Sequence, residues 1–171
     1  GMAPSARARL GVARAFQIPQ AFPHLSTYEN ALAAASFAAR LPKSEAARQA
    51  LLALEQTGLA DKADLPAGRL PLLDRKRLEL ARALASGPSL LLLDEIAGGL
   101  TDEEGKALVQ LIRRIRDRGV TIVWIEHVLH ALLAVADRIM VLNFGEKIAE
   151  GQPDDVIKDP EVRRVYMGIE A

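Results

Sequence analysis

The sequence predicts an α/β protein in which a mainly parallel sheet is covered by helices and joined to an α-helical subdomain. From Leu90 onward, strand-like and helix-like segments alternate, which is typical of parallel sheets with helical connections. Before that point, residues 26 to 86 are rich in alanine and leucine and carry helix caps. Half of the 171 residues are hydrophobic and 26% are charged, a balance typical of a globular domain.

Composition excludes several classes of protein. Acidic and basic residues number 22 each, so no net charge attracts the chain to nucleic acid. There is no cysteine, which excludes disulfides and thiolate metal sites. No apolar run approaches the roughly 20 residues of a membrane helix. We therefore expect a cytoplasmic protein.

The first half reads as one short strand followed by helices. Ala15 to Ile18 is expected to be a strand that Pro19 ends. Ser26 and Glu29 have the spacing of a capping box, which starts a helix running to about residue 39. Ser44 is expected to cap a second helix, 44–57, and Pro71 to begin a third, 71–86.

The second half alternates. Four leucines before Asp94 indicate a fully buried strand, and Thr101 with Glu104 forms another capping box. The remaining elements are expected to be a helix at 102–118, a strand at 120–125, a helix at 128–136, a strand at 138–142 with 146–150 paired beside it, and short helices from Pro153 and Pro160.

Two adjacent carboxylates, Asp94 and Glu95, follow the leucine strand. The carboxyl ends of parallel strands are where open α/β sheets place ligands. An aspartate there can bind Mg²⁺, and a neighbouring glutamate can orient or deprotonate a water. A helix cap or a plain surface charge is the alternative interpretation.

Two further polar side chains follow expected strands. His127 stands just after the strand 120–125, where an imidazole can donate to a phosphate. Gln17 can supply an amide to a metal ion or an attacking water. Taken singly, a structural histidine and a solvated glutamine explain these residues equally well.

Together these segments resemble the nucleotide-binding domain of ATP-binding-cassette (ABC) transporters. The motifs similar to that family are Phe16-Gln17 (Q-loop), 77–85 followed by 90–95 (helix to Walker B), Gly99-Leu100 (D-loop) and Glu126-His127 (switch histidine). Residues 150–168 and 16–19 are similar to the branched-chain amino acid uptake subgroup. The resemblance implies a partial P-loop NTPase core of the ABC type.

The resemblance also implies roles. Asp94 and Gln17 would bind Mg²⁺, and Glu95 would polarise the water that attacks ATP. His127 would contact the γ-phosphate, and Gln17 would couple the site to the membrane partner. The implied cofactors are ATP and Mg²⁺.

Partners and domain organisation follow from the same resemblance. The helical subdomain, about residues 22–86, would dock on a transmembrane permease at the inner face of the membrane. Residues 1–21 and 87–171 would form the α/β core and C-terminal segment. A second ATP-binding subunit is implied, and nucleic acid is not.

The sequence departs from the family at three places. It contains no Gly-x-x-x-x-Gly-Lys-Ser/Thr motif, so we expect an N-terminally incomplete chain that binds ATP weakly and hydrolyses it negligibly alone. The signature motif aligns on residues 70–74, where Leu72 and Leu73 replace glycines at the nucleotide-contacting positions and Asp74 is expected to repel phosphate. A plain, well-started helix is the other interpretation of this segment. Ile96 and Thr101 stand where the family often has proline and aspartate.

Two rival functions remain open. One is a non-catalytic module that docks on a permease or another subunit. The other is a nucleic-acid-associated ABC ATPase, which the neutral charge and missing cysteines disfavour.

Overall fold

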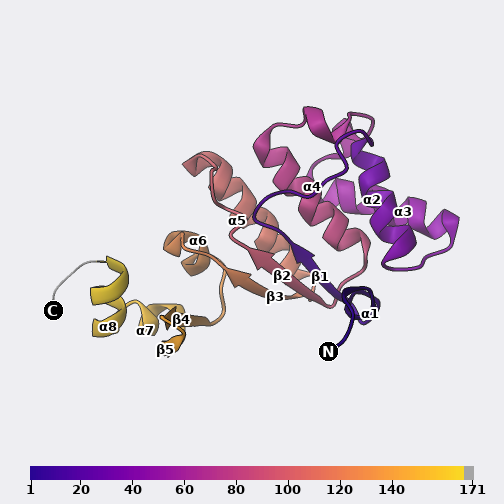
Figure 1. The fold of residues 1–171 in the computed structure, drawn as a ribbon. Helices are drawn as coiled ribbons and strands as arrows, with labels where there is room; N and C mark the ends of the chain where they lie inside the picture. The colour runs from indigo at the N-terminus through magenta and orange to yellow at the C-terminus, as the bar shows by residue number, and fades with distance from the viewer. Residues whose placement is uncertain (168–171) are drawn as a thin grey trace. The chain divides into compact units, whose positions relative to one another are not determined.

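The computed structural model describes residues 1–167, and residues 168–171, which include the end of the C-terminal run noted above, lie outside the described part. Its elements in chain order are α1 (Pro4–Arg9), β1 (Val12–Ala15), α2 (Thr27–Phe37), α3 (Lys43–Thr57), η1 (Ala60–Lys62), η2 (Ala67–Arg69), α4 (Leu72–Ala85), β2 (Leu90–Asp94), α5 (Asp102–Asp117), β3 (Thr121–Ile125), α6 (Leu129–Leu133), β4 (Ile139–Asn143), β5 (Glu146–Gly151), α7 (Pro153–Val156), α8 (Pro160–Val162) and η3 (Arg163–Met167) (Figure 1). The chain divides into two compact units, Gly1–His127 and Val128–Ala171.

The first unit contains a parallel sheet whose strands, within the described residues, are ordered β1-β2-β3. Ala15 pairs with Leu93, which in turn pairs with Trp124. Asp94 pairs with Ile125, so the last residues of β2 and β3 lie at the same level. The predicted α/β class with a mainly parallel sheet is confirmed.

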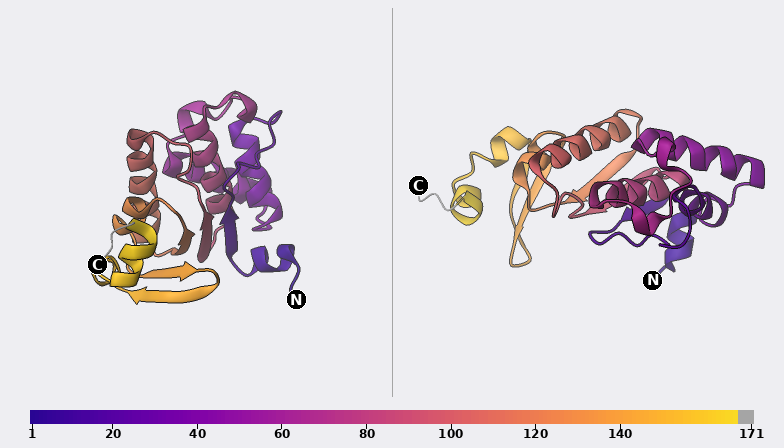
Figure 2. Two further views of the ribbon diagram at one scale, coloured as in Figure 1. Left: turned by 60° about the vertical axis from the view of Figure 1, so that its left-hand side comes forward. Right: turned by 90° about the horizontal axis from the view of Figure 1, so that it is seen from above.

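Helices α2, α3 and α4 pack against one another and form the helical block of the first unit (Figure 1). Alanines at their contacts are fully buried, including Ala31, Ala46 and Ala81, so the helix axes can approach closely. Helix α4 also contacts β1 and α5, and thus joins the helical block to the sheet (Figure 2).

Strand β2 is buried on one face only. Leu91 and Leu93 are fully buried, whereas Leu90 and Leu92 are half-buried. On the neighbouring strand, Val123 is 51% exposed. The prediction of a fully buried leucine strand is therefore wrong for this second face, since strand side chains alternate between the two faces of a sheet.

The strand before Gln17 lies three residues earlier than expected. Its pairing with β2 begins at Val12 opposite Leu90, after Ser89 and Leu90 donate backbone hydrogen bonds to Gly11. Phe16 to Ile18 thus form the exit from the strand rather than the strand itself. Helix α1, before β1, was not predicted.

Both predicted capping boxes are present. Ser26 accepts from the backbone N–H of Glu29 and caps α2, and Thr101 with Glu104 caps α5 in the same way. Ser44 does not cap α3, which begins at Lys43 with Pro42 as its N-cap. Gly58 ends α3 in a left-handed conformation (φ 71°), one residue after the predicted helix end at 57.

The second unit is built on an antiparallel hairpin of β4 and β5. Its core consists of Ile139, Val141, Val156 and Val162. Pro153 and Pro160 begin α7 and α8, as predicted. Among residues 1–167, no helix has the length and apolar character needed to cross a membrane.

Candidate active site

The carboxyl ends of the parallel strands bring together polar side chains that are far apart in sequence. Gln17 lies two residues beyond β1, Glu95 directly follows β2, and His127 lies two residues beyond β3. Because the strands are parallel and in register, these exits meet at one edge of the sheet.

Glu95 occupies the centre of this group. The Gln17 side-chain amide donates to the Glu95 carboxylate at 2.7 Å. The Nδ1 atom of His127 lies 3.5 Å from the same carboxylate oxygen. Glu95 is 36% exposed and His127 64% exposed, so a ligand from solvent can reach both. The structure thus brings Gln17 and His127 each to the same oxygen of Glu95.

Asp94 is held by a different partner. Its carboxylate forms a 2.6 Å ion pair with Arg14, the third residue of β1. The Arg14 guanidinium also lies over the Phe16 ring, 4.6 Å from its centroid. Arg14 had no predicted role, although a lone cation in an otherwise apolar strand beside an acid-terminated strand is a signal for such a pair.

Glu126 is named in the switch-histidine motif, but it had no predicted role of its own. Its side chain is fully buried, and its two oxygens accept from the backbone N–H groups of Ala97 at 2.8 Å and of His127 at 3.0 Å. The His127 Nδ1 atom lies 3.3 Å from the same carboxylate. An acidic residue between a strand and a histidine was the available sequence signal.

The backbone at Glu95 is strained. Its φ of 45° lies in the left-handed region, which non-glycine residues rarely adopt. The Glu95 N–H donates to Ile125 at 2.9 Å, which ties this turn to the neighbouring strand. Such outliers cluster at functional sites, where surrounding contacts hold them in place.

The signature-aligned segment contributes apolar contacts rather than phosphate-binding groups. Leu72 is exposed and its Cδ2 atom lies 3.5 Å from the position that a Cβ on Gly99 would take, while Leu73 is half-buried. Gly99 (φ 76°) lies in the turn after β2. The Leu72 side chain therefore lies beside the turn that contains Gly99.

Asp74 does not present a repulsive charge to the site. It is buried, and its carboxylate pairs with Lys62 at 2.5 Å and with Arg77 at 3.3 Å. The hydrogen bond from Lys62 to Asp74 raises the pKa of that lysine. The predicted repulsion is therefore wrong, because two cations neutralise the carboxylate.

Helix α4 fixes the segment that follows Gln17. The Lys76 ammonium lies 3.5 Å from the Gln17 carbonyl oxygen. The backbone N–H of Gln20 donates to Glu79 at 2.5 Å, and Arg82 donates to the Gln20 carbonyl at 2.7 Å. Burial raises the pKa of Glu79, while Arg82 and the Gln20 N–H oppose that shift.

The donor set fits magnesium in part. Asp94, Glu95 and the Gln17 amide offer oxygen ligands, and Mg²⁺ is commonly held by one or two carboxylates with water and substrate phosphates completing its shell. Among residues 1–167 no group of three or more histidine, cysteine, aspartate or glutamate residues could hold a metal ion by itself. Carboxylate and amide oxygens are of the chemical kind that Mg²⁺ takes beside water and phosphate oxygens.

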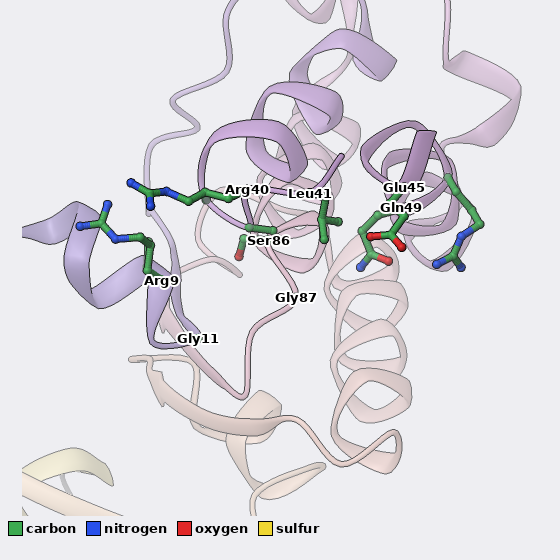
Figure 3. A pocket seen from close by; sticks show the side chains of 12 residues that line it. Arg9, Gly11, Arg40, Leu41, Glu45, Gln49, Ser86 and Gly87 are labelled. Atoms are coloured by element: carbon green, nitrogen blue, oxygen red, sulfur yellow. The ribbon is translucent and has the colours of Figure 1, made fainter. Parts of the chain in front are cut away.

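A separate cavity of about 580 Å³ lies elsewhere in the first unit and contains none of the predicted site residues. It lies between α1, the connection from α2 to α3, and the end of α4. Figure 3 shows Arg9, Arg40, Gln49 and Ser86 among its lining residues. The strand-end group is defined by converging side chains and does not line this cavity.

Comparison with known proteins gives consistent matches. The family model for the ABC transporter matches residues 2–98, and that for the branched-chain amino acid ATP-binding cassette transporter matches residues 146–171. The high-affinity branched-chain amino acid transport ATP-binding protein LivG of Salmonella typhimurium is 36% identical over 94% of this chain and 69% of its own length. The corresponding protein BraF of Pseudomonas aeruginosa is 35% identical over the same shares.

A solved structure agrees. The ADP conformation of an ATP-binding cassette of an ABC transporter superposes with a TM-score of 0.83 at 25% identity, covering 98% of this chain and 72% of that one. The chain belongs to the ABC transporter ATP-binding family.

Proposed function

We propose that this chain is the ATP-binding subunit of an ABC importer for branched-chain amino acids. The observation that supports ATP hydrolysis is the contact of Glu95 with both Gln17 and His127 at the sheet edge. The C-terminal match to the branched-chain amino acid cassette model supports the substrate class. LivG and BraF, named for that transport, support it further.

In the proposed reaction, a water oxygen forms a bond to the γ-phosphorus of ATP and the bond from that phosphorus to the β–γ bridging oxygen breaks. Glu95 orients this water and accepts its proton, and ADP leaves. His127 donates to the γ-phosphate, and Gln17 orients Glu95 and the water. Positioning and charge neutralisation supply most of the rate in such transfers.

Asp94 and Gln17 would hold a magnesium ion, which neutralises phosphate charge when bound. Arg14 occupies the Asp94 carboxylate in this structure, so the guanidinium must give way or share it. The sequence contains no glycine-rich phosphate loop, and we therefore expect the isolated chain to bind ATP weakly and hydrolyse it negligibly.

The partners belong to the same proposal. The helical block of residues 22–86 would contact a transmembrane permease at the cytoplasmic face of the membrane. A second ATP-binding subunit would complete the site, because Pro71 and Leu72 offer no hydroxyl or glycine backbone at the signature position. No nucleic acid is required.

The function is tested by measuring ATP-driven uptake of leucine, isoleucine and valine by the assembled transporter in vesicles. Glu95→Gln should abolish uptake, whereas Glu103→Gln, an exposed glutamate of α5, should leave it unchanged. Uptake that survives Glu95→Gln, with permease binding intact, would instead support the non-catalytic docking module.

The activity of the chain alone is tested separately. Purified protein with Mg²⁺ and ATP should release phosphate no faster than the Glu95→Gln variant. Substantial release that this substitution abolishes would contradict the expectation of an inactive isolated chain.

A further inference from the structure

The buried carboxylate of Glu126 connects two segments that leave adjacent strands. Its Oε1 atom accepts from the Ala97 N–H at 2.8 Å, three residues beyond the end of β2. Its Oε2 atom accepts from the His127 N–H at 3.0 Å and lies 3.3 Å from His127 Nδ1. A fully buried carboxylate needs such partners, because burying an unpaired one is costly.

The first connection fixes the backbone that carries Glu95. The left-handed turn at Glu95 (φ 45°) is held before it by the hydrogen bond from its own N–H to Ile125. After the turn, the bond from Ala97 to Glu126 holds the chain on the same neighbouring strand end. The strained conformation of Glu95 thus lies between two anchors, and Glu126 provides the second.

The second connection fixes the imidazole. A carboxylate oxygen beside Nδ1 favours the tautomer with a proton on Nδ1, since a lone pair there would face negative charge. Glu95 lies 3.5 Å from the same Nδ1 atom and acts in the same direction. The Nε2 atom is then left for the ligand side of the site.

Helix α4 provides a charge for this buried acid. Burial lowers the pKa of Lys76, and the negative charge of Glu126 opposes that shift. The Lys76 ammonium also contacts the Gln17 carbonyl oxygen at 3.5 Å. Glu126 thus joins the exits from β2 and β3, and Lys76 contacts the exit from β1.

We propose that Glu126 is a positioning residue that sets the backbone of Glu95 and the tautomer of His127 from one buried carboxylate. Its part in ATP hydrolysis rests on the proposed function. The geometry itself exists in the nucleotide-free chain, so it can be tested without ATP.

The test uses the nucleotide-free 171-residue chain and two readouts. Nitrogen-15 NMR of the imidazole, at a pH about two units above the ordinary histidine pKa of about 6.5, reports the neutral tautomer. Amide hydrogen exchange reports the protection of the Ala97 N–H. Glu126→Ala leaves Glu95 as the carboxylate beside Nδ1, so it should lower the Nδ1–H fraction of the imidazole rather than abolish it. It should also speed Ala97 exchange by at least about tenfold, as for loss of one hydrogen bond to a charged group.

Glu126→Gln is the conservative variant. Its amide has one accepting oxygen and one donating NH₂, so it can serve Ala97 or His127 but not both. Of the two readouts, the His127 tautomer and the exchange rate of the Ala97 N–H, one should stay at the wild-type value and the other should change. Glu103→Gln, on the exposed face of α5, should change neither.

Circular dichroism first establishes that each variant is folded. If Glu126→Ala unfolds, the Glu126→Gln result decides. An unchanged tautomer and unchanged Ala97 protection in a folded Glu126→Ala variant, or in Glu126→Gln if the alanine variant unfolds, would overturn the proposal. Because neither readout involves nucleotide, failure of the chain to bind ATP leaves this result unaffected.

Discussion

Glu79 illustrates how single buried charges hold this molecule together. Only 4% of its side chain is exposed, and its carboxylate accepts from Gln20 at 2.5 Å and from Arg82 at 2.8 Å. Burial raises the pKa of Glu79 even so. The native state therefore binds the proton of this residue more tightly than the unfolded chain does.

The raised pKa of Glu79 determines the direction in which the stability of the protein changes with pH. Between the ordinary glutamate pKa and the raised value, the native state holds more protons than the unfolded state, so this residue's contribution to stability falls as pH rises. Glu79→Gln keeps an accepting oxygen for both partners and removes the ionisation. We expect its unfolding free energy to fall less across this window than that of the wild type.

Urea unfolding at several pH values measures this effect. Glu55→Gln, an exposed glutamate of α3, is the matched control and should follow the wild type. A Glu79→Gln slope equal to that of the wild type would contradict the expectation.

Arg14 gives a second prediction at this scale. Its ion pair with Asp94 is partly exposed, and such pairs contribute about 0.2–1 kcal/mol. Arg14→Met should therefore tighten the binding of Mn²⁺, a paramagnetic substitute for Mg²⁺, in the presence of ATP by up to about fivefold, measured by electron paramagnetic resonance. Arg9→Met, in exposed α1, serves as the control, and unchanged or weaker binding by Arg14→Met would count against this competition.

The site residues that the sequence could predict are those whose position alone suggests a role. Gln17, Glu95 and His127 follow strands, and parallel strand ends converge. Arg14 and Glu126 were not assigned roles, because the signals at these positions do not name their partners Asp94 and Ala97, which are 80 and 29 residues away. Asp74 was misread for the same reason, since its neutralising partner Lys62 belongs to a different segment.

At the scale of the element, capping chemistry predicts some helix ends well and fails where proline intervenes. Ser26 and Thr101 cap their helices with the predicted partners. Pro42, with φ −55° and ψ 152°, already has an N-cap conformation, so α3 begins before Ser44 can take that role. The exit of β1 also differs from prediction, because strand register depends on the partner strand.

Ser26, which caps its helix, and Ser44, which does not, provide a matched pair of substitutions. Ser26→Ala removes the bond from the Glu29 N–H and should lower the unfolding free energy by about 1 kcal/mol. Ser44→Ala removes no cap and should change it by less than about 0.5 kcal/mol. Denaturant titration distinguishes them, and equal effects would contradict the assignment of Pro42 as the cap.

At the scale of the whole molecule, alternation of strand and helix predicted the parallel sheet but not where that sheet ends. The strand predicted at 138–142, with 146–150 paired beside it, is observed as the antiparallel hairpin of β4 and β5, which forms its own sheet in the second unit. Hydrophobic pattern alone does not decide whether such a hairpin belongs to the parallel sheet, because a strand in either arrangement buries one face.

The division of the chain into two compact units at residue 127 predicts that the first unit folds without the second. A fragment of residues 1–127 contains the sheet β1-β2-β3, helices α1–α5 and their buried leucines. It should unfold cooperatively and keep the amide chemical shifts of α2 to α4. A fragment that is unfolded by circular dichroism would contradict this independence.

Asn30 and helix α4 limit how far the segment between Gln17 and α2 can move. Its side chain is fully buried and exchanges hydrogen bonds with the backbone of Phe22. The backbone of Gln20 is hydrogen-bonded to Glu79 and Arg82 of α4. Two residues lie between Gln17 and Gln20, so their Cα atoms can be at most about 11 Å apart, the length of three extended residues. Gln17 can therefore move no farther from Gln20 than this length unless α4 moves with it.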